Sequence, residues 1–181
     1  MDPDCIVIGF RLSDSELKGG RYILDALKQL KSSRPIQLLT VGNIDGLPDW
    51  LVEKYACKCL PWLSEEEILS YYHALDIFLM PSLAESFGLM AIEAMACETA
   101  VICFQTTGLE FIVQAPRCGV AVEYCSALAI QKALSRLIDN PEELLARKRR
   151  GKAFIAENYR YDDYVKRHLK LYRDIASKKF L

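Results

Sequence analysis

Residues 77–104, IFLMPSLAESFGLMAIEAMACETAVICF, hold two short apolar runs separated by a loop and a helical pattern. The runs IFLM (77–80) and AVICF (100–104) are apolar throughout, which is typical of strands buried on both faces of a sheet. A proline, a serine and Gly88 mark the loop, and we expect the helix to begin between 87 and 90. The stretch therefore predicts a strand, a helix and a second strand that runs parallel to the first.

The same alternation of strands and helices continues through the rest of the chain. Apolar runs predict four further strands, at 5–10, 36–42, 57–60 and 119–122. Helical patterns lie near 20–31 and 126–138, with a helical tail over 141–181. Ser64 and Glu67 form a capping box before another helix, and Asn140 is expected to cap the tail. The fold class is therefore α/β: a Rossmann-like parallel sheet of about six strands, with helices on both faces and a helical C-terminal tail.

The composition is ordinary for a globular domain and indicates no strongly charged partner. The chain has 181 residues, enough for one hydrophobic core, and we interpret residues 1–181 as one domain. Its 23 basic and 24 acidic residues balance, so neither nucleic acid nor a membrane surface is the implied partner. The N-terminus lacks a basic segment followed by an apolar one, and no run approaches the ~20 apolar residues of a membrane span. We therefore expect a cytoplasmic protein.

The cysteines and histidines do not form the patterns of metal or redox sites. Seven cysteines are scattered along the chain without a C-x-x-C pair, and most lie in apolar runs, which is typical of reduced core thiols. His73 and His168 each stand alone in a helical pattern. The sequence therefore predicts no metal site.

The ligand site is expected at one edge of the sheet, because open parallel sheets bind ligands beyond the carboxyl ends of their strands. The loops at this edge follow residues 10, 42, 60, 80 and 104. Three of them lead into a helix through glycine: Gly19 and Gly20 after the first strand, Gly88 after the fourth, and Gly108 with Thr106 and Thr107 after the fifth. Helix N-termini carry unpaired N–H groups and partial positive charge, so three of them at one edge predict a phosphate site.

Charged residues in these loops indicate what else the ligand contains. Arg11 and Lys18 flank the loop after the first strand and can neutralise phosphate. Glu85 lies in the loop after the fourth strand, and Glu93 lies in the following helix, one turn beyond Leu89. Carboxylates at these places can accept hydrogen bonds from the vicinal hydroxyls of a sugar or a ribose. The residue types alone leave a second interpretation open, in which Glu93 pairs with a buried Lys or Arg while Glu85 and the two cations are solvated.

These residues resemble the C-terminal, donor-binding domain of retaining GT-B glycosyltransferases, the large group that includes sucrose, glycogen and mannosyl-lipid synthases. The resemblance covers nearly the whole chain, through VIGFRLSDSELKGG (7–20), the motif at 81–96, TTGLEFIV (106–113), GVAVEY (119–124) and the helical tail. Its most specific part is Pro-Ser at 81–82, then Glu85, seven residues, and Glu93 followed by Ala-Met-Ala. The resemblance implies that the ligand is a nucleotide-diphosphate sugar, used as a donor substrate.

The resemblance also implies a role for each candidate residue. It implies that Glu85 contacts the hydroxyls of the transferred sugar and that Glu93 binds the ribose. It implies that Lys18 and Arg11 neutralise the diphosphate and, with Glu85, form the catalytic set. It implies that backbone groups of Phe87, Gly88 and Leu89 contact the sugar and the diphosphate. The remaining nucleotide-sugar-binding positions are Thr107 and Gly108. No metal ion or other cofactor is implied.

A GT-B enzyme has two such domains with the active site between them, and the 181 residues match only the donor side. We therefore expect an N-terminal acceptor-binding domain of the same enzyme as a partner. A peripheral membrane contact is expected only through that domain. We also expect the isolated chain to be inactive as a hexosyltransferase-like enzyme. In the family the last helix packs back on the N-terminal domain, so an apolar stripe in the tail should be exposed or used for self-association. Two alternatives remain open: a GT-B epimerase that binds the same ligand, and a non-catalytic nucleotide-sugar-sensing module.

Overall fold

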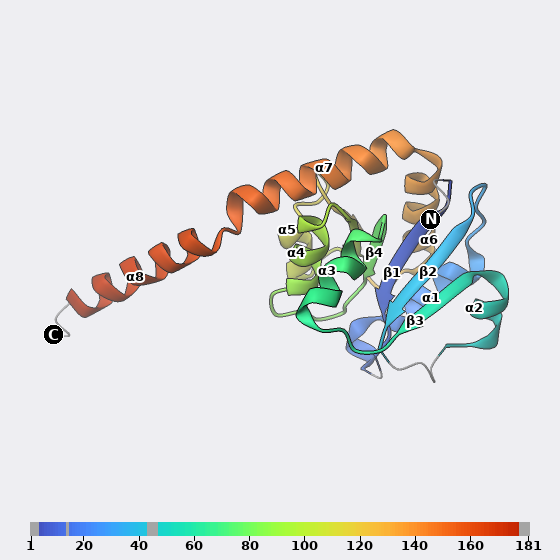
Figure 1. Ribbon diagram of the computed structural model, residues 1–181, viewed down its shortest axis with the longest axis horizontal. Helices are drawn as coiled ribbons and strands as arrows, with labels where there is room; N and C mark the ends of the chain where they lie inside the picture. Colours follow the sequence, from blue (N-terminus) through green and yellow to red (C-terminus); the bar gives the residue numbers. More distant parts are fainter. Residues whose placement is uncertain (1–3, 14, 43–46, 178–181) are drawn as a thin grey trace.

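The computed structural model describes residues 4–13, 15–42 and 47–177. Its centre is a six-stranded parallel sheet with the strand order β3-β2-β1-β4-β5-β6 (Figure 1). The strands are β1 (Ile6–Arg11), β2 (Ile36–Val41), β3 (Ala56–Leu60), β4 (Ile77–Met80), β5 (Ala100–Phe104) and β6 (Val120–Val122). The order reverses between β1 and β4, so their carboxyl ends form the topological switch point at which such sheets bind ligands.

Helices cover both faces of this sheet. They are the 3-10 helix η1 (Glu16–Lys18) and the α-helices α1 (Gly20–Gln29), α2 (Asp49–Lys54), α3 (Glu65–His73), α4 (Leu89–Ala96), α5 (Gly108–Ile112), α6 (Ala127–Asp139), α7 (Pro141–Asn158) and α8 (Tyr161–Ser177). Helices α1, α2 and α6 pack on one face, together with Ile8 and Phe10 of β1. Helices α3, α4, α5 and α7 pack on the other, together with Val7 and Phe78. The central strands β1, β4 and β5 are therefore buried on both faces, and the predicted Rossmann-like α/β fold is confirmed.

The boundaries differ from the prediction in two places. Strand β1 extends to Arg11, so this arginine ends a strand and does not belong to the following loop. Helix α2 is not among the predicted helices, because its 6 residues are too few to show a helical period. The predicted helical tail consists of two helices, since α7 ends at Asn158 and α8 begins at Tyr161. The expected ligand-bearing loop after residue 42 falls on 43–46, outside the described residues.

Helix capping follows the prediction at α3 and in part at α7. The N–H of Glu67 donates to the Ser64 hydroxyl and the Glu67 carboxylate accepts from the Ser64 N–H, so the capping box is confirmed. Asn140 is the N-cap residue of α7, as predicted, and the acidic first turn of α7 follows it. Its side chain makes no capping hydrogen bond, because the amide of Asn140 donates to the carbonyl oxygen of Arg136 at 2.7 Å. It serves the C-terminal end of α6, where the last carbonyls lack helical partners.

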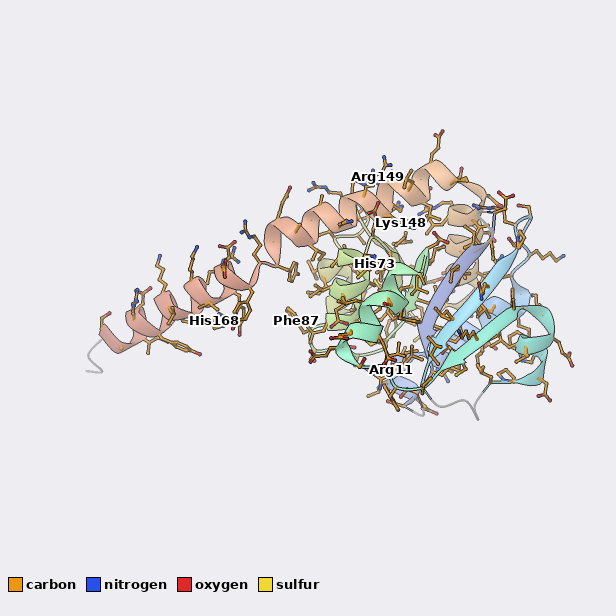
Figure 2. All side chains as sticks on the ribbon, in the orientation of Figure 1. Arg11, His73, Phe87, Lys148, Arg149 and His168 are labelled. Carbon is orange, nitrogen blue, oxygen red and sulfur yellow. The ribbon has the colours of Figure 1, made fainter. Side chains whose placement is uncertain are left out.

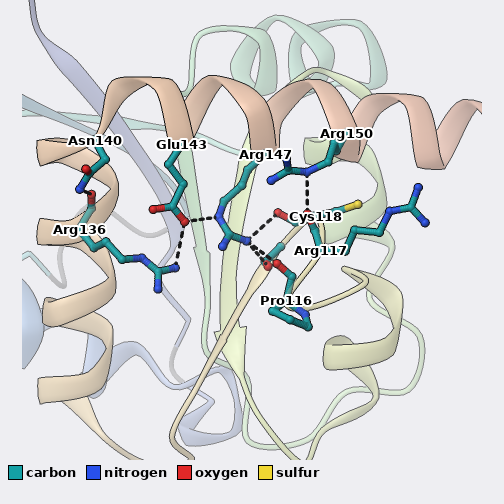
Figure 3. Close-up of polar contacts among 9 residues, drawn as sticks. Pro116, Arg117, Cys118, Arg136, Asn140, Glu143, Arg147 and Arg150 are labelled. Carbon is teal, nitrogen blue, oxygen red and sulfur yellow. Dashed lines mark hydrogen bonds and ion pairs between the residues drawn. The ribbon is translucent and has the colours of Figure 1, made fainter.

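Helix α7 is anchored to the loop before β6 by Arg147. The guanidinium donates to the carbonyl oxygens of Pro116 at 2.8 Å and Gly119 at 2.9 Å, and its Nε donates to Glu143 at 2.8 Å (Figure 3). The Arg147 side chain is only 10% exposed. Because α7 also packs against α4, this anchor supports the helix that carries Glu93.

Helix α8 extends away from the rest of the domain (Figure 1). None of its described residues is buried. Its exposed large side chains include Tyr161, Tyr164, Leu169 and Tyr172, so the apolar stripe expected in the tail is exposed. Within the described residues, no helix combines the length and the apolar character needed to cross a membrane.

Candidate functional site

The carboxyl ends of β1 and β4 bring Lys18 and Glu85 together. Lys18 Nζ donates to Glu85 Oε2 at 2.9 Å, and the two side chains are 36% and 14% exposed. Lys18 ends η1, which follows β1, and Glu85 lies in the loop after β4. The interpretation of Glu85 as a solvated carboxylate is therefore wrong, because its largely buried side chain has a cationic partner.

Two glycines give these loops their shape. Gly19 is the N-cap of α1 with a φ of 72°, and a Cβ at this position would lie 2.0 Å from the carbonyl oxygen of Pro81. The Leu83 N–H donates to the Leu17 carbonyl at 2.8 Å, so the loops after β1 and β4 are in direct contact. Gly88 is the N-cap of α4 with a φ of 84°, and a Cβ there would lie 2.5 Å from a leucine side chain. Only glycine fits both positions without strain.

The helices α1, α4 and α5 all begin at this edge without a side-chain cap. At α1 and α4 the first N–H groups therefore have no side-chain acceptor. At α5 a carboxylate is already present, since Glu110 accepts from the N–H of Thr106 at 3.0 Å. The Thr107 hydroxyl donates to the backbone at 3.1 Å. Gly108 adjoins the loop after β4, because a Cβ on it would lie 3.8 Å from the Glu85 carbonyl oxygen.

Glu93 lies on α4 and faces Tyr72 of α3. The Tyr72 hydroxyl donates to Glu93 Oε2 at 3.1 Å. Burial, and then the charge of Glu93, raise the pKa of Tyr72, so its hydroxyl remains a donor. Among residues 4–13, 15–42 and 47–177, no ion pair includes Glu93 and no donor is bonded to its Oε1. The interpretation of Glu93 as the partner of a buried Lys or Arg is therefore wrong.

Glu93 lines a hollow of about 200 Å³ that also reaches Arg11 and Val41, the last residues of β1 and β2. Its lining is completed by Trp62, Leu63, Ile68, Tyr71, Tyr72 and Met90. A hollow of about 20 Å³, room for about one water molecule, is lined by Arg11, Lys18, Ser82, Met90 and residues of β4. Arg11 and Met90 line both hollows. Figure 2 labels Arg11 at the carboxyl end of β1. The Lys18 side and the Glu93 side of the site therefore adjoin at Arg11.

A larger hollow of about 350 Å³ lies beside the Glu93-lined hollow and shares Leu63 and Tyr71 with it. It extends along the sheet from Val7 and Gln37, near the amino ends of β1 and β2, to Leu60 at the carboxyl end of β3. Ligands of this fold bind at the carboxyl ends of the strands. We therefore take the hollow of about 200 Å³ as the functional one, because the last residues of β1 and β2 line it together with Glu93.

Phe87 and Leu89 are 51% and 61% exposed, whereas Gly88 between them is buried. The predicted role of these three residues uses their backbone groups and makes no demand on the exposed side chains. His73 and His168 lie far apart, on α3 and α8 (Figure 2). In the part of the chain that the structure describes, no group of three or more His, Cys, Asp and Glu side chains could hold a metal ion.

The predicted set lacks the aromatic partners of Arg11 and Glu93, which are Trp62 and Tyr72. Trp62 lies in the loop after β3 with the Arg11 guanidinium carbon 4.4 Å from its ring centroid. Tyr72 is fully buried, and in the sequence it is indistinguishable from a core residue. For Trp62 a signal exists, because the loop after residue 60 is one of those expected to carry the ligand.

The sequence profile of the family "Glycosyl transferases group 1" matches residues 2–140. The chain belongs to this family. It is 30% identical over 185 residues to a D-inositol 3-phosphate glycosyltransferase of Corynebacterium urealyticum. This alignment covers 94% of this chain and 43% of that relative. A sucrose-phosphate synthase from Thermosynechococcus elongatus superposes with a TM-score of 0.81 at 26% identity, over 96% of this chain and 46% of that one.

The group 1 domain also has a solved counterpart of its own size. It is the C-terminal domain of the glycosyl transferase group 1 family protein LpcC from Francisella tularensis, with a TM-score of 0.70 and 25% identity over 86% of this chain and 87% of that one. In contrast, the chain spans less than half of the length of the Corynebacterium glycosyltransferase. It corresponds to the C-terminal domain of a GT-B glycosyltransferase.

Proposed function

We propose that this group 1 domain binds a nucleotide-diphosphate sugar and supplies the donor side of a retaining, metal-independent glycosyl transfer. The observation that carries the proposal is the environment of Glu93. Its carboxylate lines a hollow at the carboxyl ends of the strands and has one neutral partner, Tyr72, among the described residues. A carboxylate held in this way presents an oxygen to a ligand that donates hydrogen bonds, as the ribose hydroxyls do.

The charges around Glu93 suit a diphosphate next to a sugar. Lys18 and Arg11 supply fixed positive charge, and the N-termini of α1 and α4 add backbone donors. Together these groups would stabilise the charge that develops on the diphosphate as it leaves the sugar, without a divalent cation. Glu85, bonded to Lys18, would lie where the diphosphate meets the sugar and would accept bonds from the sugar hydroxyls.

The ribose assignment predicts the response to Glu93→Gln. The substitution keeps the shape but removes the charge, and a neutral hydrogen bond is weaker than a charged one by about 1 kcal/mol. We therefore expect the nucleoside, the monophosphate and the diphosphate of the preferred base each to bind about fivefold more weakly. The corresponding deoxyribose ligands should hardly respond. Calorimetric titration measures these affinities, after a thermal-shift screen has identified the base.

Glu98→Gln is the matched control, because Glu98 follows the same helix but pairs with Lys152 and does not line the hollow. It should leave every affinity unchanged. The ribose assignment is abandoned if Glu93→Gln lowers the melting temperature sharply and changes no affinity, since Glu93 would then be a structural residue.

We propose that the acceptor is bound by an N-terminal domain, to which the exposed apolar stripe of α8 is complementary. The isolated chain should accordingly bind a nucleotide-diphosphate sugar yet transfer no sugar to any acceptor. A radiolabelled-donor assay with this chain alone, and with a protein that carries both domains, checks the expectation. Robust transfer by the pure, monomeric chain would contradict the two-domain mechanism.

The two-domain protein also separates the alternatives. If it converts the donor into its epimer without an acceptor, the protein is an epimerase and not a transferase. Tight donor binding with neither reaction would identify a sensing module.

A further inference from the structure

Arg11 is held in the middle of the site by an aromatic ring. Its guanidinium carbon lies 4.4 Å from the centroid of the Trp62 ring. Its Nε is buried and has no hydrogen-bond partner, and within the described residues Arg11 forms no ion pair. A guanidinium carries five N–H donors around its edge. A ring that covers its flat face leaves those edge donors for another group.

The position of Arg11 shows which group the edge donors would meet. Arg11 lines the hollow that contains Glu93 and also the hollow that contains Lys18. Of the residues that line both hollows, Arg11 and Met90, only Arg11 is charged. An anionic ligand group that lies between Lys18 and Glu93 would therefore lie beside the guanidinium. In the proposed binding mode, the part of the ligand between the ribose and the transferred sugar is the diphosphate, an anion that matches arginine donors.

Trp62 itself is well placed to hold another side chain. It is 66% exposed, so it contributes little to the hydrophobic core. The loop that carries it is anchored on its C-terminal side by the partly buried Leu63 and by the capping box of Ser64 with Glu67. Its backbone is therefore fixed while its ring remains at the surface of the site.

We propose that Trp62 is a positioning residue that acts through Arg11. This inference rests on the proposed function: the indole ring holds the guanidinium between Lys18 and Glu93, so that its edge donors meet the diphosphate of the donor substrate. Without the ring, the arginine samples many rotamers and must be ordered when the ligand binds. Trp62 should therefore matter for ligands that contain a diphosphate and not for the nucleoside alone.

The test measures affinities of Trp62→Ala and Trp62→Phe for inorganic pyrophosphate, and for uridine, guanosine and adenosine with their diphosphates. Trp62→Ala should weaken pyrophosphate and the bound nucleoside diphosphate by about three- to tenfold. The matching nucleoside should change by less than about twofold, and Trp62→Phe should recover most of the loss because phenylalanine also offers a ring face. Trp50→Phe is the matched control, since Trp50 faces Lys28 at 5.9 Å and does not line either hollow.

A double substitution shows whether Trp62 acts through Arg11. In an Arg11→Ala background, Trp62→Ala should cause no further loss of diphosphate affinity, because the guanidinium it positions is gone. Additive losses would overturn the inference, because Trp62 would then act independently of Arg11. An equal loss for the nucleoside would overturn it too and would identify Trp62 as a contact of the base. If the wild type binds the diphosphate and Trp62→Ala binds it equally well, the inference about Trp62 is overturned while the proposed function stands. Absence of any diphosphate binding by the wild type overturns it together with the proposed function.

Discussion

Replacing Lys18 with alanine is expected to weaken the binding of a nucleoside diphosphate by about 10- to 100-fold, while the nucleoside binds almost as before. A charged hydrogen bond contributes roughly 1.5 to 3 kcal/mol, which corresponds to this range of affinity. The ion pair with Glu85 adds to the effect, because the substitution leaves that carboxylate without its cation beside an incoming anion. Calorimetric titration with the nucleoside, the monophosphate and the diphosphate measures the difference.

Lys152→Ala is the control for this prediction. Lys152 pairs with Glu98 at 3.0 Å, so the substitution breaks a similar ion pair, but it lines neither hollow of the site. Its effect on all three ligands should be negligible. An equal loss of the three ligands in Lys18→Ala would show that Lys18 supports the fold of the loops and does not bind the diphosphate.

Arg147→Ala is expected to lower the free energy of unfolding by about 3 kcal/mol. The guanidinium bonds to the carbonyl oxygens of Pro116 and Gly119 and to Glu143, and it is largely buried (Figure 3). Its removal takes this donor from the exposed carbonyl of Pro116 and the partly buried carbonyl of Gly119, and leaves Glu143 with Arg136 alone at 3.4 Å. Hydrogen bonds to a charged group contribute about 1.5 to 3 kcal/mol. For a domain of 181 residues this corresponds to a fall in the melting temperature of about 6 to 12 °C.

Arg149→Ala provides the comparison on the same helix. Arg149 is exposed on α7 (Figure 2), so its removal should change the free energy of unfolding by less than about 0.5 kcal/mol. Calorimetry or urea denaturation of the two variants checks both values. Equal melting temperatures for the two variants would show that the Arg147 contacts do not stabilise the domain.

The fold could be predicted because its strongest signals are local. Runs such as AVICF are apolar at every position, which is consistent only with burial on both faces, and Gly88 precedes the first residue of α4 within the predicted range. Helix α2 escaped prediction because 6 residues form less than two helical turns. Asn140 was correctly placed at the N-cap of α7, but the sequence did not show that its amide would bond to the preceding helix and not to α7.

The contacts of the site could be predicted less well, because they join residues distant in the sequence. Lys18 and Glu85 are separated by 67 positions, and their ion pair depends on β1 and β4 being neighbours in the sheet. The hydroxyl of Tyr72, on α3, donates to Glu93 on the neighbouring helix α4. Residue types therefore indicated which groups take part, whereas the sheet order and helix packing decide which of them touch.

Helix α8 is energetically almost independent of the domain from which it extends. None of its 17 residues is buried, so little tertiary packing offsets the entropy of ordering them. Isolated helices shorter than about 12 to 15 residues are marginal in water, and α8 is only slightly longer. We therefore expect α8 on its own to exist in an equilibrium between ordered and frayed forms.

This equilibrium would affect how tightly any partner surface binds to α8. Docking would order the helix and close the interface in one step, so part of the contact energy would offset the ordering cost. Substitutions on the side of α8 that touches nothing would then change the association constant through the population of the free helix. The strength of the contact would depend on helix propensity as much as on the apolar stripe itself.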